Sequence, residues 1–404
     1  MRIAIFTDTY SPDINGVATH IKVLRDGLVE LGHEVLIVTS STKYHSHTMK
    51  NGILYCPAIK LKKLYGYGVA SPLHHSRFLM VKRFNPDIIH TQQEFSMCLS
   101  AIRIAKLLHI PLVYTLHTMY DDYIYYIVPK PFVGVAKKVF YRYIGYIGRR
   151  SSAVTSPSAK AEPFLDKCHL KKDVSVIPNS IELSEFSPEA TGKEQLDAIR
   201  QKYGIPLDST VGIFCGRLAA EKSIDNLMDS LKTCIDFKGL NFRLLVIGDG
   251  PARGDLIAHA EKIGISDFVS FTGRIEHSEI MPVYEACDVY VSASTTEMMS
   301  ISMLEGMAAG LPVIQKYDEA NAHQIIEGVN GHNYKNNDQL GKFVKEICLM
   351  DADRKKEMKK KVRDSVSSNS PADLANYLLD IYTGSIETYK KKVKRKRRLK
   401  YKKS

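Results

Sequence analysis

The sequence lacks any run of apolar residues that approaches the roughly 18 to 20 required by a membrane-spanning helix. Its first segment, MRIAIFTD, meets an aspartate too early for a signal peptide. We therefore expect a protein that is neither integral to a membrane nor exported.

Paired metal-ligand spacings are also missing. The seven cysteines show no such spacing and lie mostly in apolar stretches, which is typical of reduced, buried thiols in a cytoplasmic protein. The one Asp-x-Asp pair, Asp351 and Asp353, opens a lysine-rich helical segment, where an aspartate fits a helix N-cap. We predict neither a metal nor a cofactor.

The sequence does contain enough apolar residues, 44% of 404, to bury two cores, and its length favours two domains. Short β-branched runs alternate with helical patterns, which predicts α/β domains with parallel sheets. In the first half, the expected strands are RIAIFTD, EVLIVTS, DIIHT and PLVYTLHT, with a helix from Val17 to Leu31. In the second half, they are VGIFCG, FRLLVIGDG, FVSFTG, VYVSAS and LPVI.

These patterns predict two doubly wound, Rossmann-like domains, residues 1–180 and 181–370. The linker is expected in the proline-containing segment 174–188. A terminal helix is expected at 371–389 and a polybasic tail at 390–404. In doubly wound sheets ligands bind at the carboxyl ends of the strands, so we expect the site in a cleft between the two domains.

The segment TTEMMSISMLEGMAAGLPVI, residues 295–314, places two carboxylates, Glu297 and Glu305, eight residues apart. Ser300 fits the N-cap of a short helix, which a glycine and a proline end. Glu297 then precedes the helix and Glu305 lies within it, while the backbone N–H groups of Ser300, Ile301 and Ser302 offer an anion site. A nucleotide sugar is the leading ligand, although both glutamates could be ordinary charges at a helix end.

A second segment, GRLAAEK at residues 216–222, follows the apolar run VGIF and places Arg217 and Lys222 in the turn after a strand. A guanidinium and an ammonium together suit a diphosphate and would neutralise it as it departs. Charged residues after a strand are also common on ordinary surfaces.

Together these segments resemble the retaining glycosyltransferases of the GT-B class, of the family 4 type, which carry GRL-x-x-EK and E-x7-E in their C-terminal half. The stretches LLVIGDGP, FTGRI and VYEACDVYVSAS agree with that family. The resemblance also implies that the terminal helix at 371–389 packs back on the first domain. The sequence departs from it at residues 298–300, where many relatives have Gly, an aromatic residue and Gly.

The resemblance implies a donor site made of Arg217, Lys222, Gly248, Arg274, Glu297, Ser300, Ile301 and Glu305. In that site Glu305 would hold the ribose, Glu297 the hexose near its 3- and 4-hydroxyls, and the two cations the departing diphosphate. Arg274, where relatives hold the base, does not separate uracil from guanine. A donor phosphate oxygen would take the acceptor proton, so no protein base is assigned.

In the first domain, Asn15 and Gly16 stand just before a helix, where a small residue lets the backbone reach a phosphate; the pair could also be only a turn and helix start. The phrases NGV-x-T and TLHTMYDDY resemble the bacterial 1,2-diacylglycerol 3-glucosyltransferases. This resemblance implies that His117 orients the donor sugar on its 6-hydroxyl side, although a lone histidine at a strand end is more often structural. Asp121, Asp122 and the nearby tyrosines would shape the acceptor mouth.

Basic residues are concentrated at the C-terminus. The segment from Lys390 to Lys403 contains eleven Lys or Arg, so nearly all of the net charge of +12 is local. Such a segment binds anionic membranes, binds RNA or only solubilises. Residues 123–150 favour the membrane, because the part after Pro131 fits a basic amphipathic helix. Alternatively, this helix packs inside the first domain with its basic residues at the surface.

The resemblance implies a peripheral enzyme on the inner face of the cell membrane. It would move glucose from UDP-glucose to the 3-hydroxyl of 1,2-diacylglycerol with retention, without a metal and without a nucleic-acid partner. Alternatives are a sibling transferase using GDP-mannose or UDP-galactose on phosphatidylinositol, another glycolipid or a polysaccharide precursor; a glycoside hydrolase using the two glutamates; and a non-catalytic scaffold that binds membranes or RNA.

Overall fold

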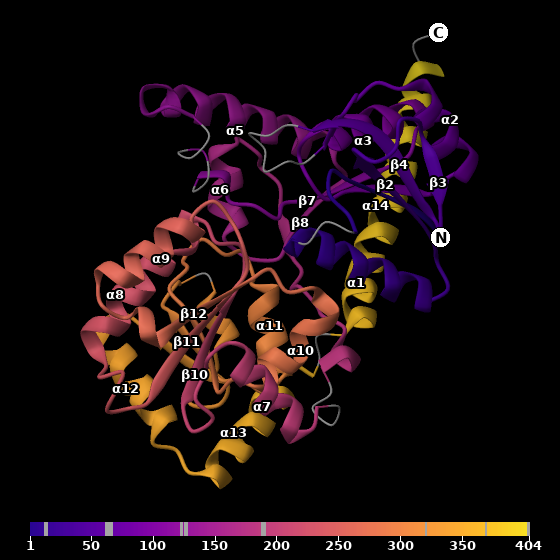
Figure 1. Cartoon of the computed structure of the whole chain (residues 1–404). Helices are drawn as coiled ribbons and strands as arrows, with labels where there is room; N and C mark the ends of the chain where they lie inside the picture. Colours follow the sequence, from indigo (N-terminus) through magenta and orange to yellow (C-terminus); the bar gives the residue numbers. More distant parts are fainter. Residues whose placement is uncertain are drawn as a thin grey trace. The chain divides into compact units, whose positions relative to one another are not determined.

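The computed structural model describes residues 1–11, 15–60, 68–121, 124, 128–186, 191–319, 321–367 and 370–401. The chain forms two compact units: residues 1–180 with 371–404, and residues 181–370. Each unit is built around a largely parallel sheet with helices on its faces (Figure 1). The predicted α/β class with two Rossmann-like units is therefore confirmed.

The first unit contains nine strands among its described residues, in the order β3-β4-β2-β1-β6-β7-β8-β9, with β5 paired to β4. Only β3 and β5 run antiparallel to their neighbour β4. The strands are β1 (Arg2–Thr7), β2 (Glu34–Ser41), β3 (Thr48–Lys50), β4 (Ile53–Lys60), β5 (Gly68–Ala70), β6 (Ile88–Thr91), β7 (Leu112–Thr115), β8 (Ala153–Ser156) and β9 (Val174–Val176).

The helices of the first unit include one from the far end of the chain. They are α1 (Gly16–Glu30), α2 (His75–Phe84), α3 (Ser96–Leu108), α5 (Val133–Arg150), α6 (Ala161–Lys167) and α14 (Pro371–Tyr401). Leu374, Leu378 and Tyr382 of α14 lie in the same core as Ile21 and Leu24 of α1, and the two helices lie side by side in Figure 1.

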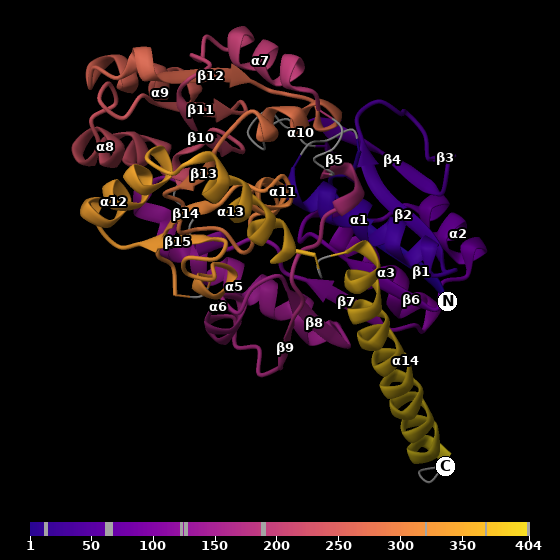
Figure 2. The same ribbon diagram turned by 90° about the horizontal axis from the view of Figure 1, so that it is seen from below.

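The second unit has the strand order β12-β11-β10-β13-β14-β15 among its described residues, which Figure 2 shows in sequence. This is the doubly wound order, in which the chain starts at a central strand and winds outward in both directions. The strands are β10 (Thr210–Cys215), β11 (Phe242–Ile247), β12 (Val269–Gly273), β13 (Val289–Ser292), β14 (Val313–Lys316) and β15 (Gly331–Tyr334).

Helices cover both faces of this second sheet. They are α7 (Lys193–Lys202), α8 (Ile224–Cys234), α9 (Arg253–Lys262), α10 (His277–Glu285), α11 (Ile301–Ala308), α12 (Asn337–Cys348) and α13 (Ala352–Asp364). Successive residues of β10 contribute to the cores on opposite faces of the sheet. Ile213 lies in the core with α11, and Phe214 lies in the core with α8. Asp351 is the N-cap of α13, as predicted, and accepts a hydrogen bond from the Arg354 backbone at 2.9 Å.

Two expectations about the chain ends and the linker need correction. The terminal helix does not end at residue 389, because α14 continues through the basic run to Tyr401. The predicted linker begins as a strand, since residues 174–176 form β9 and pair with β8. In the described part of the chain no helix is both long and apolar enough to span a membrane.

Gly27 is the point where α1 meets the start of α14. A Cβ atom at Gly27 would lie 2.2 Å from the Pro371 carbonyl oxygen. We predict that Gly27→Ala lowers the free energy of unfolding by about 1 to 3 kcal/mol, because backbone on both sides must shift.

The matched control is Gly384→Ala within α14, where a Cβ atom meets nothing within 4 Å. There, alanine should stabilise by up to about 1 kcal/mol through helix propensity. Denaturant unfolding of both variants checks the contrast, and equal stability of Gly27→Ala and the parent chain would contradict it.

Candidate active site

The strand order of the second unit reverses between β10 and β13, which are hydrogen-bonded neighbours. Such a pair of strands marks the switch point of the sheet. Ligands of doubly wound sheets bind at the carboxyl ends of these two strands. The segment after β10 carries Arg217 and Lys222, and the segment after β13 carries Glu297 and leads into α11. The fold therefore brings together the two motifs found in the sequence.

Lys222 and Glu297 form an ion pair between these two segments. Both side chains are only partly exposed, at 14% and 25%. The Glu297 carbonyl oxygen also accepts a hydrogen bond from the Asn321 side chain at 2.6 Å. The ammonium of Lys222, which follows β10, and the carboxylate of Glu297, which follows β13, are thus held in contact.

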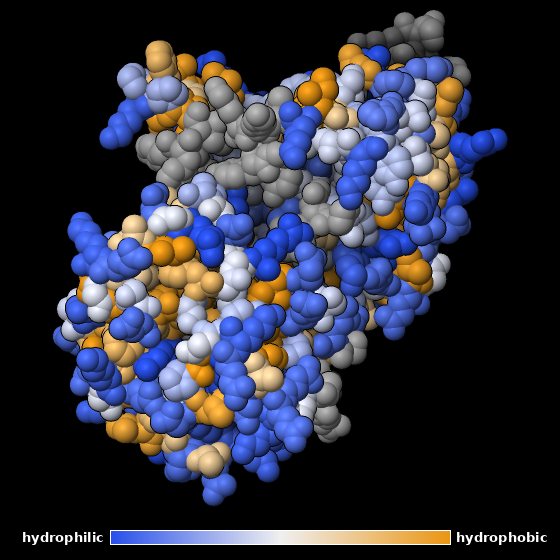
Figure 3. All heavy atoms as spheres, viewed as in Figure 1, coloured by the Kyte–Doolittle hydropathy of each residue, from blue (hydrophilic) through white to orange (hydrophobic). Residues whose placement is uncertain are grey.

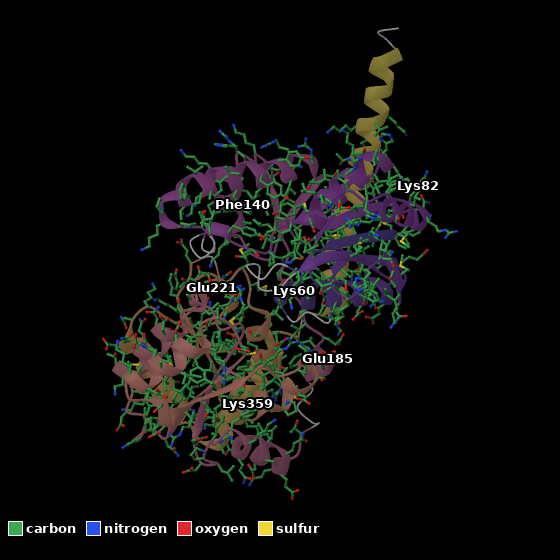
Figure 4. All side chains as sticks on the ribbon, turned by 45° about the horizontal axis from the view of Figure 1, so that its top comes forward. Lys60, Lys82, Phe140, Glu185, Glu221 and Lys359 are labelled. Atoms are coloured by element: carbon green, nitrogen blue, oxygen red, sulfur yellow. The ribbon has the colours of Figure 1, made fainter. Side chains whose placement is uncertain are left out.

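Arg217 is held by a residue that sequence analysis did not single out. Its Nη2 lies 2.6 Å from Oε1 of Glu221, a buried carboxylate in the same turn, labelled in Figure 4. The Glu221 carbonyl oxygen accepts a hydrogen bond from the Thr296 hydroxyl at 3.0 Å. Glu221 therefore orients the guanidinium and also joins the turn after β10 to the loop before α11.

The start of α11 has the predicted cap. The Ser300 hydroxyl accepts a hydrogen bond from the Met303 backbone at 3.3 Å, and Ile301 is the first helical residue. The Ser302 hydroxyl donates to the Cys215 carbonyl oxygen at 2.8 Å, which ties the helix to the end of β10. The first N–H groups of a helix have no intrahelical acceptor, so this end attracts an anion.

Glu305 lies one turn inside α11 and is 5% exposed. Its Oε1 accepts a hydrogen bond from His277 Nε2 at 3.0 Å, and its Oε2 accepts one from the Tyr284 hydroxyl at 3.1 Å. His277 also lies 3.6 Å from the carboxylate of Glu185. This burial differs from that of an ordinary surface charge, and the two partners fix the orientation of the carboxylate.

The two remaining donor-site candidates differ in their surroundings. Gly248 follows β11 with φ +129°, and a Cβ atom there would lie 1.9 Å from the Gly216 carbonyl oxygen, so only glycine fits. Arg274 follows the edge strand β12, where it is exposed and pairs with Glu276 at 3.5 Å. The structure thus places Gly248 against the GRL segment and Arg274 two strands away from the switch point.

In the first unit His117 lies two residues beyond the end of β7, not at its last residue. Its Nε2 donates to the Gln92 side-chain oxygen at 2.7 Å. Burial holds the pKa of His117 well below its ordinary value, and the neighbouring His20 and His90 lower it further. The ring is therefore neutral, and its Nδ1 is an acceptor.

Asn15 is the N-cap of α1, because its Oδ1 accepts a hydrogen bond from the Ala18 backbone at 2.9 Å. Asn15 and Gly16 thus form the start of a helix, which was one of the two interpretations of this pair. Asp121 lies 2.8 Å from Lys167 and 3.5 Å from Lys137, so it links α6 to α5. Asp122 and the tyrosines at 123, 125 and 126 lie outside the described residues.

Two buried carboxyl groups lie near the switch point of the first sheet, between β1 and β6. Glu94 accepts hydrogen bonds from the hydroxyls of Tyr114, at 2.7 Å, and of Tyr120. Its carbonyl oxygen accepts one from Tyr143 of α5. Burial raises the pKa of Glu94 to about 7 and that of Asp8 to about 6.

Two family models match this chain. The model described as Glycosyltransferase Family 4 matches residues 14–185, and the model described as Glycosyl transferases group 1 matches residues 196–365. An alpha-monoglucosyldiacylglycerol synthase of Streptococcus pneumoniae is 35% identical over 314 residues, which cover 78% of this chain and 70% of that protein. The chain is a glycosyltransferase of the family 4 type.

Other relatives of this glycosyltransferase agree with the assignment. An alpha-monoglucosyldiacylglycerol synthase of Acholeplasma laidlawii is 29% identical over 396 residues, 96% of each chain. The crystal structure of Anabaena Alr3699/HepE in complex with UDP-glucose has a TM-score of 0.71 at 17% identity and covers 95% of this chain and all of that one. The glycosyltransferase therefore has the GT-B fold.

Sequence reasoning missed the groups that hold the candidate residues of the glycosyltransferase. Glu221 stood inside the quoted GRLAAEK segment, and its position four residues after Arg217 was a signal for the pair. His277, Gln92 and Glu94 gave no local signal, because their partners are 20 or more residues away. Within the described residues, no group of three or more His, Cys, Asp or Glu could hold a metal ion.

Glu94 makes the stability of the glycosyltransferase depend on pH. Its pKa is about 7 in the folded chain against an ordinary 4.5, so the folded state holds the proton more tightly. The resulting stabilisation is complete below pH 4.5 and is lost as the pH rises to about 7. It amounts to on the order of 3 kcal/mol.

We predict that Glu94→Gln, which cannot ionise, flattens the fall of the melting temperature between pH 5 and 7. Glu346→Gln, at an exposed position on α12, serves as the control and should keep the parent slope. Thermal unfolding at several pH values measures both. A parent-like slope in Glu94→Gln would show that Glu94 does not carry the extra proton.

Proposed function

We propose that this glycosyltransferase moves glucose from UDP-glucose to the 3-hydroxyl of 1,2-diacylglycerol, with retention of configuration, at the inner face of the cell membrane. The observation that carries the proposal is the Lys222–Glu297 ion pair beside the start of α11. It joins a cation, a carboxylate and a helix N-terminus at one switch point. The relatives named alpha-monoglucosyldiacylglycerol synthase support the lipid acceptor.

In this proposal the diphosphate of the donor competes with Glu297 for Lys222. The ammonium moves to a phosphate oxygen, and Arg217 and the N-terminus of α11 complete the neutralisation of the leaving group. Three fixed positive groups therefore do the work that a metal ion does in other transferases. The released Glu297 carboxylate then accepts hydrogen bonds from the hexose near its 3- and 4-hydroxyls.

Glu305 is proposed to accept the ribose hydroxyls. Each of its carboxylate oxygens already accepts one hydrogen bond, from His277 or Tyr284. A carboxylate oxygen has two lone pairs, so a second acceptor position remains on each. His277 and Tyr284 would keep these positions aimed at the nucleotide.

His117 is proposed to accept a hydrogen bond from the 6-hydroxyl of the hexose through Nδ1. The Gln92 side chain holds the proton on Nε2, and burial keeps the ring neutral. A donor phosphate oxygen would take the proton of the acceptor hydroxyl on the same face. Asp121 is not assigned to the acceptor, because it is paired with Lys137 and Lys167.

A sibling activity with another donor is the second candidate. A relative in Mycolicibacterium smegmatis, 25% identical over 320 residues, is a GDP-mannose-dependent alpha-mannosyltransferase. Radiolabelled UDP-glucose, UDP-galactose and GDP-mannose, each offered with diacylglycerol or phosphatidylinositol in anionic vesicles, separate the two. Labelled glucosyl-diacylglycerol supports the proposal, whereas transfer only from GDP-mannose or only to another acceptor contradicts it.

Lys222→Met tests the proposed role of the cation. We predict a fall in turnover of about 10²- to 10³-fold, because a charge that stabilises the leaving diphosphate is removed. Lys232→Met, an exposed lysine on α8, is the control and should keep the parent rate. Near-normal turnover of a folded Lys222→Met chain would remove Lys222 from the mechanism.

The membrane contact is proposed to involve α5. Its C-terminal half packs into the first unit, with Ile144 and Ile147 fully buried. At its N-terminal end, the N-cap residue Phe132 and the helical residues Val135 and Val139 are exposed at 63%, 65% and 61%. Figure 3 shows apolar and charged atoms together at this end of α5, at the upper left. The C-terminal half of α5 thus packs inside the first unit, whereas the exposed apolar residues at its N-terminal end support the proposed membrane contact.

The basic run at the C-terminus is proposed to add to this membrane contact. Because α14 stays helical to Tyr401, residues 390–401 belong to a helix and not to an extended tail. In Figure 1 the end of α14 and the helix α5 both lie on the upper side of the first unit. Each Lys or Arg near an anionic surface contributes about 1 kcal/mol at most.

We predict that Val135→Ser with Val139→Ser weakens binding to anionic vesicles by on the order of tenfold, because two exposed apolar side chains no longer enter the bilayer. Val29→Ser, at an exposed valine of α1, is the control and should bind like the parent chain. Vesicle co-sedimentation measures the three proteins. Unchanged binding of the double variant would exclude α5 from the contact.

A further inference from the structure

A second histidine lies against His117. His20 of α1 is 2% exposed, and its ring meets that of His117 edge-on, with ring centroids 4.7 Å apart and planes at 68°. Its Nδ1 lies 2.9 Å from the side-chain oxygen of Asn179, which is also buried. His117, His20 and Asn179 therefore form a continuous line of contacts.

The hydrogen bond to Asn179 determines where the proton of His20 lies. Because the amide oxygen accepts, Nδ1 carries the hydrogen and Nε2 is a bare acceptor. Nε2 is buried and has no hydrogen-bond partner among the described residues. Burial lowers the pKa of His20 to about 4, so the ring stays neutral at physiological pH.

The groups around His20 are also neutral. His90 of β6 is hydrogen-bonded to the hydroxyls of Tyr382, at 2.7 Å, and Thr115, at 2.6 Å, and burial lowers its pKa to about 3. His117 follows β7, and Asn179 follows β9. A charge introduced at His20 would therefore lie beside the neutral rings of His90 and His117 and the amide of Asn179.

Asn179 lies next to the point where the chain leaves the first unit, since that unit ends at Ser180. The chain returns to it at Pro371, whose carbonyl group packs on Gly27 of α1. The helix α1 thus contacts both crossing points, one through His20 and the other through Gly27. His20 connects the departing segment with the ring of His117.

We propose that His20 is a positioning residue, which holds the ring of His117 in the orientation that accepts a sugar hydroxyl and is itself held by Asn179. This inference rests on the proposed role of His117 in binding the donor sugar. In this proposal His20 itself does not contact the substrate. A buried histidine with one ring nitrogen on an amide and its ring on His117 can rotate in neither direction without losing one of the two contacts.

The test introduces a charge at Asn179. Asn179→Asp keeps the size of the side chain and the hydrogen bond, but its carboxylate favours the imidazolium form of His20 and raises its pKa. The imidazolium then faces the ring of His117. As the pH falls, the ring of His117 should therefore lose the orientation that accepts the sugar hydroxyl. We expect turnover of Asn179→Asp at pH 6 to be at least about tenfold below its value at pH 8.5, with the donor KM little changed.

The control combines Asn179→Asp with His20→Phe. Phenylalanine keeps a ring against His117 but cannot titrate, so the new loss of activity at low pH should disappear. A parent-like pH profile in a folded Asn179→Asp chain would overturn the inference, and so would the same acid loss in the double variant. A parent enzyme that transfers no glucose to lipid would instead contradict the proposed function alone.

Histidine NMR provides a readout that does not depend on turnover. With labelled histidine, the His117 ring signals of Asn179→Asp should shift together with the titration of His20. His20→Phe/Asn179→Asp should show no such step. His117 signals that stay constant while His20 titrates would overturn the inference whatever the enzyme transfers.

Discussion

The reversal of strand order between β10 and β13 is the constraint on which the site of the second unit depends. The two strands are neighbours in the sheet, yet the helices that follow them, α8 and α11, pack in different cores on its two faces. The carboxyl ends of both strands are therefore left uncovered side by side. Lys222 and Glu297, 75 residues apart in sequence, form an ion pair there for this reason.

The two units supply different kinds of chemistry. Charged pairs lie at the strand ends of the second unit, where Arg217 pairs with Glu221 and Lys222 pairs with Glu297. Buried histidines lie at the switch point of the first unit, where burial keeps them neutral and also raises the pKa of Glu94. The first arrangement suits charge neutralisation, and the second suits orientation of hydroxyl groups.

The elements that follow from local patterns could be predicted from the sequence. Apolar runs located β1, β2, β6, β7 and β10 to β14, and Ser300 was correctly placed as the cap of α11. Six of the described strands were missed: β3, β4, β5, β8, β9 and β15. Three of them, β3, β5 and β9, have only three residues, and β4 contains a proline, which argues against a strand. The partners of the site residues were missed because hydrogen bonds such as His277 to Glu305 join segments that only the folded sheet brings together.

The anomeric configuration of the product distinguishes the proposed mechanism from its alternatives. We propose that one nucleotide-sugar site, with fixed cations at the leaving diphosphate and no protein base, transfers glucose to diacylglycerol with retention. UDP-glucose and diacylglycerol in anionic vesicles are incubated with the full chain, and the glycolipid is examined by proton NMR. We expect an α-linked glucosyl-diacylglycerol, which has the configuration of the donor. A β-linked product, or no glycolipid at all, would contradict this proposal.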